Sequence, residues 1–175
     1  PHFLFNNLNI LSSLIDHNSE QAQDFLGNFS EVYRYVLRQR EEELVPLRSE
    51  LEFLDAYVYM LRQRFRKQVH IEIDIQPSHR ALFLPPLALQ MLIENAIKHN
   101  KATESSPLTI TIQSQEGGIY VCNTLQVKRI PPKGTGFGLE NLRKRYEFLS
   151  MKSLRVEKAN DQFCVFLPLL STEPS

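Results

Sequence analysis

The chain has 175 residues and carries 20 basic side chains (Lys and Arg) and 20 acidic ones (Asp and Glu), so its formal net charge is zero. That length suits one domain, or one domain with a small helical addition. An apolar fraction of 42% is enough for a hydrophobic core and excludes a disordered chain. Balanced charge gives no overall attraction to polyanions, so we expect no nucleic-acid partner.

The number of cysteines and the hydropathy pattern exclude further classes of protein. Cys122 and Cys164 are too few for a disulfide scaffold or a zinc site, and both lie in apolar runs. We therefore expect two buried thiols in a reducing compartment. No run reaches the roughly 18 apolar residues that a membrane span needs, and no signal peptide is present. The sequence begins at Pro1 inside a helical pattern, so we interpret it as the C-terminal part of a longer protein.

Three helices are predicted in the first 65 residues. Two of them show apolar residues at steps of four, three and four: Leu4, Leu8, Leu11 and Ile15, then Phe25, Phe29, Val32 and Val36. Together they predict an antiparallel helical hairpin over residues 1–45. Because a lone hairpin cannot cover its own apolar face, we expect it to pack on a partner, a second copy being the candidate. The third helix is expected to begin near Ser49, which has capping-box spacing to Glu52.

The period changes at Val69, where alternating apolar residues predict a strand. Further along, the pattern predicts a helix, a strand hairpin, a second helix and a last hairpin: a helix after Pro85 and Pro86, strands near 108–112 and 119–121, a helix over 139–149, and strands over 154–157 and 163–169. This order predicts an α+β fold. The hairpin is followed, over residues 46–175, by a two-layer α/β sandwich with a mixed, mostly antiparallel sheet and helices on one face.

Three glycines stand at alternate positions directly before a predicted helix. Gly134, Gly136 and Gly138 let the backbone approach a ligand closely, and the N-terminus of the following helix attracts an anion. Phosphate is therefore the natural ligand. A flexible linker loop has the same composition, so the glycines alone leave both interpretations open.

A polar cluster lies on the helix that follows the two prolines. Glu94, Asn95, Lys98 and His99 occupy neighbouring helical turns. One interpretation is a solvated face with a Glu94–Lys98 salt bridge. The other is a patch that holds a metal-bound triphosphate, with Asn95 and Glu94 toward Mg²⁺ and Lys98 toward phosphate.

The first predicted helix begins with a histidine. His2 shares a polar stripe with Asn6, Asn9 and Ser13, on the side opposite the leucines. An exposed imidazole at this place can accept a phosphoryl group. The alternative is an ordinary surface histidine at a helix end.

In combination, four motifs resemble those of the LytS-type sensor histidine kinases, in the same order and over nearly the whole chain. The family's phosphoacceptor box is similar to PHFLFNNLNIL, which makes His2 the acceptor, and the helix after its hairpin is similar to SELEFLDAYVYMLRQRF. Its N box resembles LPPLALQMLIENAIKHN, in which Asn95 binds Mg²⁺ and Lys98 and His99 line the nucleotide. Its G2 box resembles GTGFGLENLRKRY, which places the three glycines and Leu139 against the phosphates.

This resemblance implies a Bergerat (GHKL) fold and an ATP- and Mg²⁺-dependent protein-histidine kinase. Asn95 and Glu94 hold Mg²⁺, the glycine loop closes on the phosphates, and His2 attacks the γ-phosphorus. The phosphoryl group then passes to an aspartate of a response regulator, for which the LytTR type is one candidate. The resemblance also implies a homodimer through the N-terminal helices. It places this part in the cytoplasm and anchors the parent protein in the bacterial inner membrane through a region outside this sequence.

The segment that ends the predicted strand near 119–121 departs from the family pattern. ATP-binding relatives carry a G1 box, Asp-x-Gly-x-Gly, whose aspartate accepts a hydrogen bond from the adenine amino group. The corresponding stretch here is Val121–Leu125, with Asn123 and no glycine. Asn123 can accept through its side-chain oxygen, but a neutral acceptor makes a weaker hydrogen bond than a charged one. A non-catalytic dimeric signalling scaffold with a degenerate nucleotide site is therefore the alternative function.

Two further positions bear on the reaction. Met91 stands where hydrolytic relatives place a water-activating glutamate, which disfavours a free ATPase, whereas a histidine nucleophile needs no activated water. Asn6 lies one turn after His2 and could position water for a phosphatase acting on the regulator. That activity can coexist with a kinase.

Overall fold

The computed structural model describes residues 2–39, 41–129, 137–149 and 152–171. Five helices and seven strands lie within these ranges, in the following order: α1 (His2–His17), α2 (Ser19–Arg38), β1 (Val45–Pro46), α3 (Leu47–Phe65), β2 (Val69–Asp74), β3 (Phe83–Leu84), α4 (Ala88–His99), β4 (Leu108–Gln115), β5 (Gly118–Thr124), α5 (Phe137–Leu149), β6 (Arg155–Ala159) and β7 (Gln162–Pro168). Short 3-10 turns, Arg66–Gln68 and Pro77–His79, flank β2. No helix in the described ranges combines the length and the apolar character that crossing a membrane requires.

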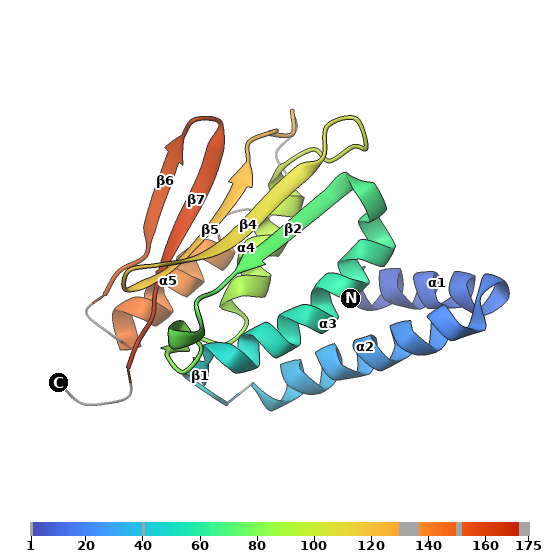
Figure 1. The fold of residues 1–175 in the computed structure, drawn as a ribbon, viewed down its shortest axis with the longest axis horizontal. Coiled ribbons are helices and arrows are strands. Elements are labelled where there is room, and N and C mark those ends of the chain that lie inside the picture. The colour runs from blue at the N-terminus through green and yellow to red at the C-terminus, as the bar shows by residue number, and fades with distance from the viewer. Residues whose placement is uncertain (1, 40, 130–136, 150–151, 172–175) are drawn as a thin grey trace.

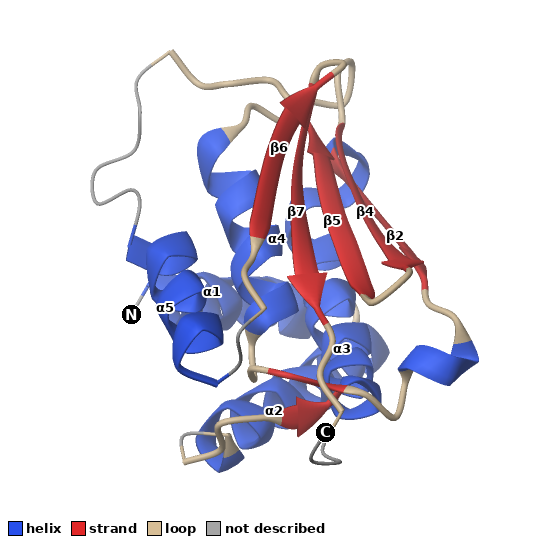
Figure 2. Ribbon diagram, turned by 90° about the vertical axis from the view of Figure 1, so that its left-hand side faces the viewer, coloured by secondary structure: helices blue, strands red, loops and turns tan. Residues whose placement is uncertain are grey.

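The architecture is a two-layer α+β sandwich with a helical hairpin beside it, as predicted. Five strands form one sheet in the order β2-β4-β5-β7-β6, in which β2 runs parallel to β4 and the other pairs are antiparallel. Figures 1 and 2 show α3, α4 and α5 on one face of this sheet, and α1 and α2 as a separate hairpin against α3. A two-stranded ribbon of β1 and β3 lies near the base of the sandwich.

Helix α2 buries the face that its periodicity predicts. Phe25 and Val32 are fully or almost fully buried, and Asn18 caps the helix by accepting a hydrogen bond from the backbone amide of Gln21 at 3.1 Å. Asn18 thus ends α1 and starts α2 within one residue. This tight connection produces the predicted antiparallel hairpin.

Helix α1 packs inward through a face next to the leucine stripe. Phe3, Asn7, Ile10 and Leu14 point toward the core, and Asn7 is 5% exposed. The leucine stripe stays partly open, because Leu8 and Ile15 are 45% and 61% exposed, and Phe5 beside them is 64% exposed. An apolar surface therefore remains open on the hairpin, and its packing on a second copy stays a prediction.

Helix α3 begins earlier than the capping-box spacing predicts. The helix starts at Leu47, directly after Pro46 with its extended ψ of 140°, and no side chain caps it, so the prediction of a Ser49 cap is wrong. The amide of Leu47 donates to the Leu82 carbonyl at 2.8 Å. Since a nearby backbone carbonyl satisfies the first orphan amide, the helix needs no capping side chain there.

The prediction of two separate buried thiols is also wrong. Strands β5 and β7 place Cys122 directly opposite Cys164, with their Cα atoms 4.1 Å apart, and a disulfide joins them. Both side chains are only partly buried, and they point to the opposite sheet face from their buried neighbours Val121 and Val165. Forty-two residues separate the two cysteines in the sequence, so only the strand pairing brings them together.

One continuous hydrophobic core joins the hairpin to the sandwich. It includes Phe25 of α2, Leu54 and Tyr57 of α3, and Tyr146 of α5. The buried Tyr146 hydroxyl donates to the Pro168 carbonyl at 3.0 Å, which ties α5 to the end of β7. The division into residues 1–45 and 46–175 stays a prediction.

Gly118, at the start of β5, offers a test of this packing. A Cβ atom here would overlap the Leu167 carbonyl oxygen and lie 2.7 Å from Cζ of Phe166. We expect Gly118→Ala to lower the free energy of unfolding by about 1–3 kcal/mol, as overpacking does. Gly27 of α2 has no atom within 4 Å of its Cβ position, so Gly27→Ala is the matched control and is expected to stabilise by up to about 1 kcal/mol. Denaturant unfolding measures both; equal midpoints for the two variants would contradict the prediction.

Candidate functional site

A pocket of about 380 Å³ opens between α4, the sheet and the start of α5. Its lining is mostly apolar with a few polar side chains: Leu92, Asn95, Ala96, His99, Asn100, Val121, Asn123, Leu125, Val127, Leu139, Lys158, Phe163 and Val165. We call it the α4–β5 pocket. Its volume and composition are those of a small-molecule site, for which about 300–1,000 Å³ is typical.

The start of α4 sets which side chains face this pocket. The helix begins at Ala88, two residues after the prolines, and Leu87 before it adopts a left-handed φ of 63°. Leu89, Leu92 and Ile93 then face the core. With that face fixed, Asn95 and His99 line the α4–β5 pocket, and their contact with a nucleotide stays a prediction.

Asn123 enters the pocket from β5 and is 6% exposed. Its Nδ2 atom donates to the Thr124 carbonyl at 2.8 Å. A carbonyl oxygen accepts only, so this hydrogen bond fixes which end of the amide is nitrogen. The other end, Oδ1, is therefore an acceptor.

The segment after β5 is fastened to the C-terminal end of α4. Asn100 is buried and its Oδ1 accepts from the Gln126 amide at 2.8 Å, while its Nδ2 donates to the Ala96 carbonyl at 2.9 Å. The backbone amide of Lys128 donates a hydrogen bond to the His99 carbonyl. The side-chain Nζ of Lys128 donates to the Lys98 carbonyl at 2.9 Å. The glycine-rich loop thus departs from one end of α4.

The described residues on the far side of that loop return to the middle of α4. A Cβ atom on Gly138 would lie 3.6 Å from Oδ1 and Nδ2 of Asn95 and from Cγ of Met91. Leu139 follows and lines the pocket. Gly138 therefore lies beside Asn95 and Leu139 beside the pocket, and their contact with phosphates stays a prediction. Gly134 and Gly136 lie outside the described residues.

Glu94 and Lys98 face away from Asn95, into a second pocket of about 600 Å³ between α1, α3 and α4. We call it the α1–α4 pocket. The Glu94 carboxylate accepts hydrogen bonds from Tyr57 Oη at 3.0 Å and from Gln90 Nε2 at 2.6 Å. Asn6 lines the same pocket. The structure therefore brings Asn6, Glu94 and Lys98 together and puts the body of α4 between them and the α4–β5 pocket.

His2 opens α1, at the hairpin end nearest α3 and α4. The placement of its side chain lies outside what the structure describes. The next residue, Phe3, stacks on Tyr57 with 6.2 Å between the ring centroids, and Phe3 lines the α1–α4 pocket. The histidine backbone thus lies beside the pocket that holds Asn6 and Glu94.

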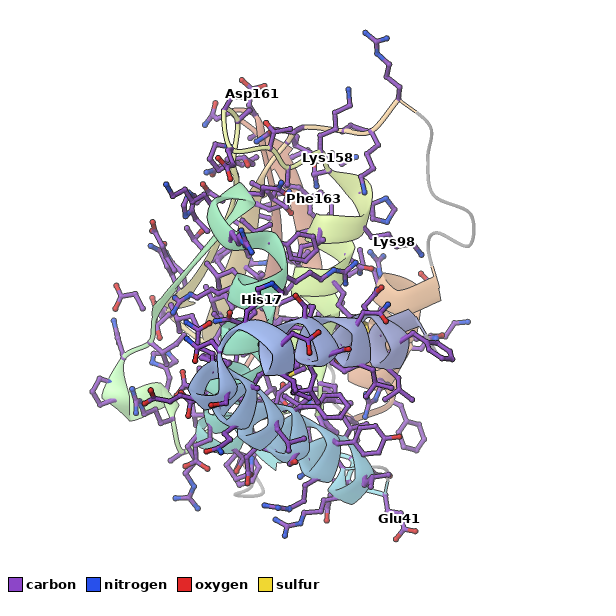
Figure 3. All side chains as sticks on the ribbon, turned by 90° about the vertical axis from the view of Figure 1, so that its right-hand side faces the viewer. His17, Glu41, Lys98, Lys158, Asp161 and Phe163 are labelled. Atoms are coloured by element: carbon purple, nitrogen blue, oxygen red, sulfur yellow. A yellow bond between two sulfur atoms is a disulfide. The ribbon has the colours of Figure 1, made fainter. Side chains whose placement is uncertain are left out.

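Two pocket residues escaped the sequence analysis. Lys158 and Phe163 lie opposite each other on β6 and β7, and the Lys158 ammonium lies 5.7 Å from the centre of the Phe163 ring. Figure 3 shows both at the same end of the molecule as Lys98. The predicted last hairpin held the signal for them. Its turn in the structure is the two residues Asn160 and Asp161, and a two-residue turn fixes which flanking residues pair.

His99 sits in surroundings that oppose its protonation. Burial lowers its pKa below the ordinary value of 6.5, and the positive charges of Lys98 and Lys128 lower it further. A neutral imidazole that both donates and accepts is therefore available in the pocket at neutral pH.

This lowered pKa makes stability depend on pH. Below pH 6.5 the unfolded chain protonates His99 while the folded chain resists, so the free energy of unfolding should decrease as the pH falls from 6.5 through the folded pKa. We expect His99→Gln to flatten this decrease, measured by denaturant unfolding at several pH values. His70→Gln, at an exposed position of β2, is the control and should keep the slope. A slope that His99→Gln leaves unaltered would contradict the assignment.

The side chains at the site limit how a metal could bind. Within the described ranges no group of three or more His, Cys, Asp or Glu side chains is placed to hold an ion. Mg²⁺ commonly takes one or two protein oxygens and completes its shell with substrate phosphates and water. The Asn95 amide, facing the space beside Gly138, fits that minor share of a coordination shell.

Comparison with known proteins agrees with this geometry. A family model described as histidine kinase matches residues 1–69. The sensor protein LytS of Bacillus subtilis is 31% identical over 161 residues, which cover 83% of this chain and 27% of that protein. The chain is homologous to the LytS-type sensor histidine kinases. LytS of Oceanobacillus iheyensis is 35% identical over 123 residues, covering 69% of this chain and 21% of that protein.

A third LytS relative carries a second activity in its name. The sensor histidine kinase/phosphatase LytS of Staphylococcus aureus is 29% identical over 176 residues, covering 90% of this chain and 30% of that protein. The chain therefore spans less than a third of the length of these LytS proteins.

Solved structures support the fold. The catalytic domain of the histidine kinase ThkA aligns with a TM-score of 0.50 at 18% identity, over 74% of this chain and all of that one. The cytoplasmic segment of the histidine kinase QseC aligns with a TM-score of 0.50 at 14% identity, over 73% of this chain and 76% of that one. The sandwich and its helices therefore share the fold of these two structures.

Proposed function

We propose that this chain is the kinase region of a two-component sensor histidine kinase, which transfers a phosphoryl group from ATP to His2 and then to an aspartate of a response regulator. The observation that carries the proposal is the α4–β5 pocket, whose loop leaves α4 at His99 and Asn100 and returns to it at Asn95. A glycine-rich segment that is flanked by contacts with the end and with the middle of one polar helix suits enclosure of phosphates.

Asn123 is the residue that selects the base in this proposal. Because its Nδ2 is held by the Thr124 carbonyl, its Oδ1 remains to accept a hydrogen bond from the amino group of adenine. Guanine presents an acceptor at the corresponding position, which that oxygen could not bond. The apolar side chains of Leu125, Val127 and Phe163 would cover the faces of the base.

Asn95 and His2 carry the chemistry in this proposal. Bound Mg²⁺ would neutralise charge on the phosphates, and Asn95 is the side chain placed to hold it. An imidazole nitrogen of His2 forms the new bond to the γ-phosphorus, the bond to the bridging oxygen breaks, and ADP leaves. Positioning supplies most of the rate in phosphoryl transfer, so the hairpin must deliver His2 in line. Glu94, in the α1–α4 pocket with Asn6 and Lys98, is on the His2 side of α4.

The test is a calorimetric titration with ATP, with and without Mg²⁺, followed by incubation with labelled ATP. Mg²⁺-dependent binding and an acid-labile, alkali-stable phosphate on the chain are the expected results, since phosphohistidine has that stability. No binding at millimolar ATP would refute the kinase and favour the non-catalytic dimeric scaffold, in which the pocket is a degenerate site. Comparison of ATP with GTP tests Asn123 separately.

The hairpin surface suggests how two chains assemble. On α2, Leu26, Tyr33 and Leu37 are 48%, 48% and 52% exposed, which adds to the open apolar residues of α1. We infer that this surface pairs with its copy in a homodimeric helical bundle. A response regulator, of LytTR type as one candidate, would be the second partner. The parent protein would be anchored in the bacterial inner membrane with this part in the cytoplasm.

A phosphatase activity toward the regulator is the second candidate function. Asn6 lines the α1–α4 pocket beside Glu94 and Lys98, one turn after His2. An amide there can position water for attack on a phosphoryl group. The Staphylococcus aureus relative has the phosphatase in its name. Asn6→Ala should then lower dephosphorylation of a phosphorylated regulator while His2 labelling continues.

A further inference from the structure

Four aromatic rings form a continuous ladder through the interface between the hairpin and α3. Tyr35 of α2 stacks on Phe53 at 4.5 Å between centroids, Phe53 stacks on Tyr57 at 5.8 Å, and Tyr57 stacks on Phe3 of α1 at 6.2 Å. Their interplanar angles stay between 17° and 24°. Aromatic pairs prefer offset-stacked or edge-to-face arrangements, so these contacts favour particular orientations of the rings.

Both hydroxyls of this ladder end on carboxylates that connect to α4. Tyr35 Oη donates to Glu50 Oε1 at 2.7 Å, and the same oxygen accepts from the Leu87 amide at 2.8 Å, at the start of α4. Tyr57 Oη donates to Glu94 Oε1 at 3.0 Å, in the second half of α4. Hydrogen bonds therefore connect the ladder to α4 at two points, the start of the helix and Glu94.

Tyr57 joins the two reacting parts most directly. Its ring holds Phe3, the residue after His2, and its hydroxyl holds Glu94, the residue before Asn95. Tyr57 is 2% exposed, so its ring is held in place by packing, whereas Glu94 is exposed. Burial raises the pKa of Tyr57, and the charge of Glu94 raises it further, so the hydroxyl stays a donor at neutral pH.

We propose that Tyr57 is a positioning residue for phosphoryl transfer, which sets the first turn of α1 against α4 through its ring and its hydroxyl. The proposal rests on the proposed function, because His2 and Asn95 must be the groups that it aligns. Tyr35 and Glu50 form the second point of the same alignment, at the other end of the ladder. Tyr57 does not touch the α4–β5 pocket, so it acts through its neighbours.

The decisive variant is Tyr57→Phe in the full chain. It keeps the stacked ring and removes the hydroxyl, and Glu94 keeps its hydrogen bond from Gln90, so no buried acceptor is orphaned. We expect the dissociation constant for ATP to change less than about twofold and the maximal rate of His2 labelling to fall about tenfold, because displacements near 1 Å cost that much or more. Tyr59→Phe removes a hydroxyl two residues away on α3 and is the matched control.

The readouts separate positioning from a general structural role. Hydrogen exchange of residues 3–10 in α1 is expected to become faster in Tyr57→Phe and to stay unchanged in Tyr59→Phe. A labelling rate equal to that of Tyr59→Phe would overturn the proposal, and so would a joint loss of ATP affinity and unfolding midpoint. If the unsubstituted chain is not labelled at all, the proposed kinase function is wrong. Hydrogen exchange in α1 tests the contact role of Tyr57 separately, and unchanged exchange in Tyr57→Phe would refute that role as well.

Discussion

His2→Gln is expected to abolish the transfer of phosphate from ATP to the chain while leaving ATP affinity unchanged. Glutamine has no nucleophilic ring nitrogen, and removal of the nucleophile in covalent catalysis lowers the rate by several orders of magnitude. His2 lies on α1, whereas the side chains that line the α4–β5 pocket come from α4, α5 and the sheet side. Binding and transfer therefore depend on different elements. Labelled ATP measures the transfer, and calorimetry measures the affinity.

The chain supplies its own control for this experiment. His17 ends the same helix and is exposed, with its Nδ1 atom 2.7 Å from the Ser13 carbonyl oxygen. His17→Gln should leave labelling intact, because that histidine is fifteen residues along α1 and lines neither the α4–β5 pocket nor the α1–α4 pocket. Label that persists in His2→Gln and disappears in His17→Gln would move the acceptor to the other end of α1.

Local periodicity predicted the elements whose burial depends on near neighbours. The steps of four and three around Phe25 and Val32 fix a helix face, and the alternation from Val69 fixes a strand, because both patterns are read within two turns or a few residues. The same reasoning located α4 and α5 and therefore the two ends of the candidate site. Asn95 and Gly138 are 43 positions apart in the sequence and lie side by side in the structure.

Long-range pairing lay beyond the sequence. The disulfide between Cys122 and Cys164 follows from the register of β5 with β7, which no spacing of two cysteines reveals. The start of α3 likewise depends on the Leu82 carbonyl, 35 residues from Leu47, which replaces the expected Ser49 cap. Both differences arise where the fold brings together residues that are distant in the sequence.

The sequence analysis also did not predict that the polar residues of α4 line two different pockets. Successive residues of a helix point about 100° apart, so Glu94 and Asn95 diverge. Glu94 accepts a hydrogen bond from Tyr57 and lines the α1–α4 pocket, whereas Asn95 lines the α4–β5 pocket. The sequence grouped both toward one metal ion. Their separation on either side of α4 gives the predicted roles different surroundings and makes them separable by substitution.

Asn95→Ala is expected to weaken Mg²⁺-dependent ATP binding by about 10- to 100-fold. A hydrogen bond or ligand contact to a charged group is worth about 1.5–3 kcal/mol, and each 1.4 kcal/mol is tenfold in affinity. Alanine favours helix, so α4 should persist. Asn28→Ala on α2 is the control, since that exposed amide donates to the Asp24 carbonyl at 2.9 Å, away from both pockets. Calorimetry with and without Mg²⁺ measures the effect.

The metal dependence of that loss decides what Asn95 does. If Asn95 supplies an oxygen to Mg²⁺, its removal should cost affinity only when Mg²⁺ is present. An equal loss with and without the metal would make Asn95 a nucleotide contact and refute its metal role. Gly138→Ala gives an independent check, because its Cβ atom would lie 3.6 Å from the Asn95 amide, at ordinary contact distance. That variant should fold and still lose Mg²⁺-dependent binding, since the methyl group occupies the space over the amide that the ion and its phosphates need.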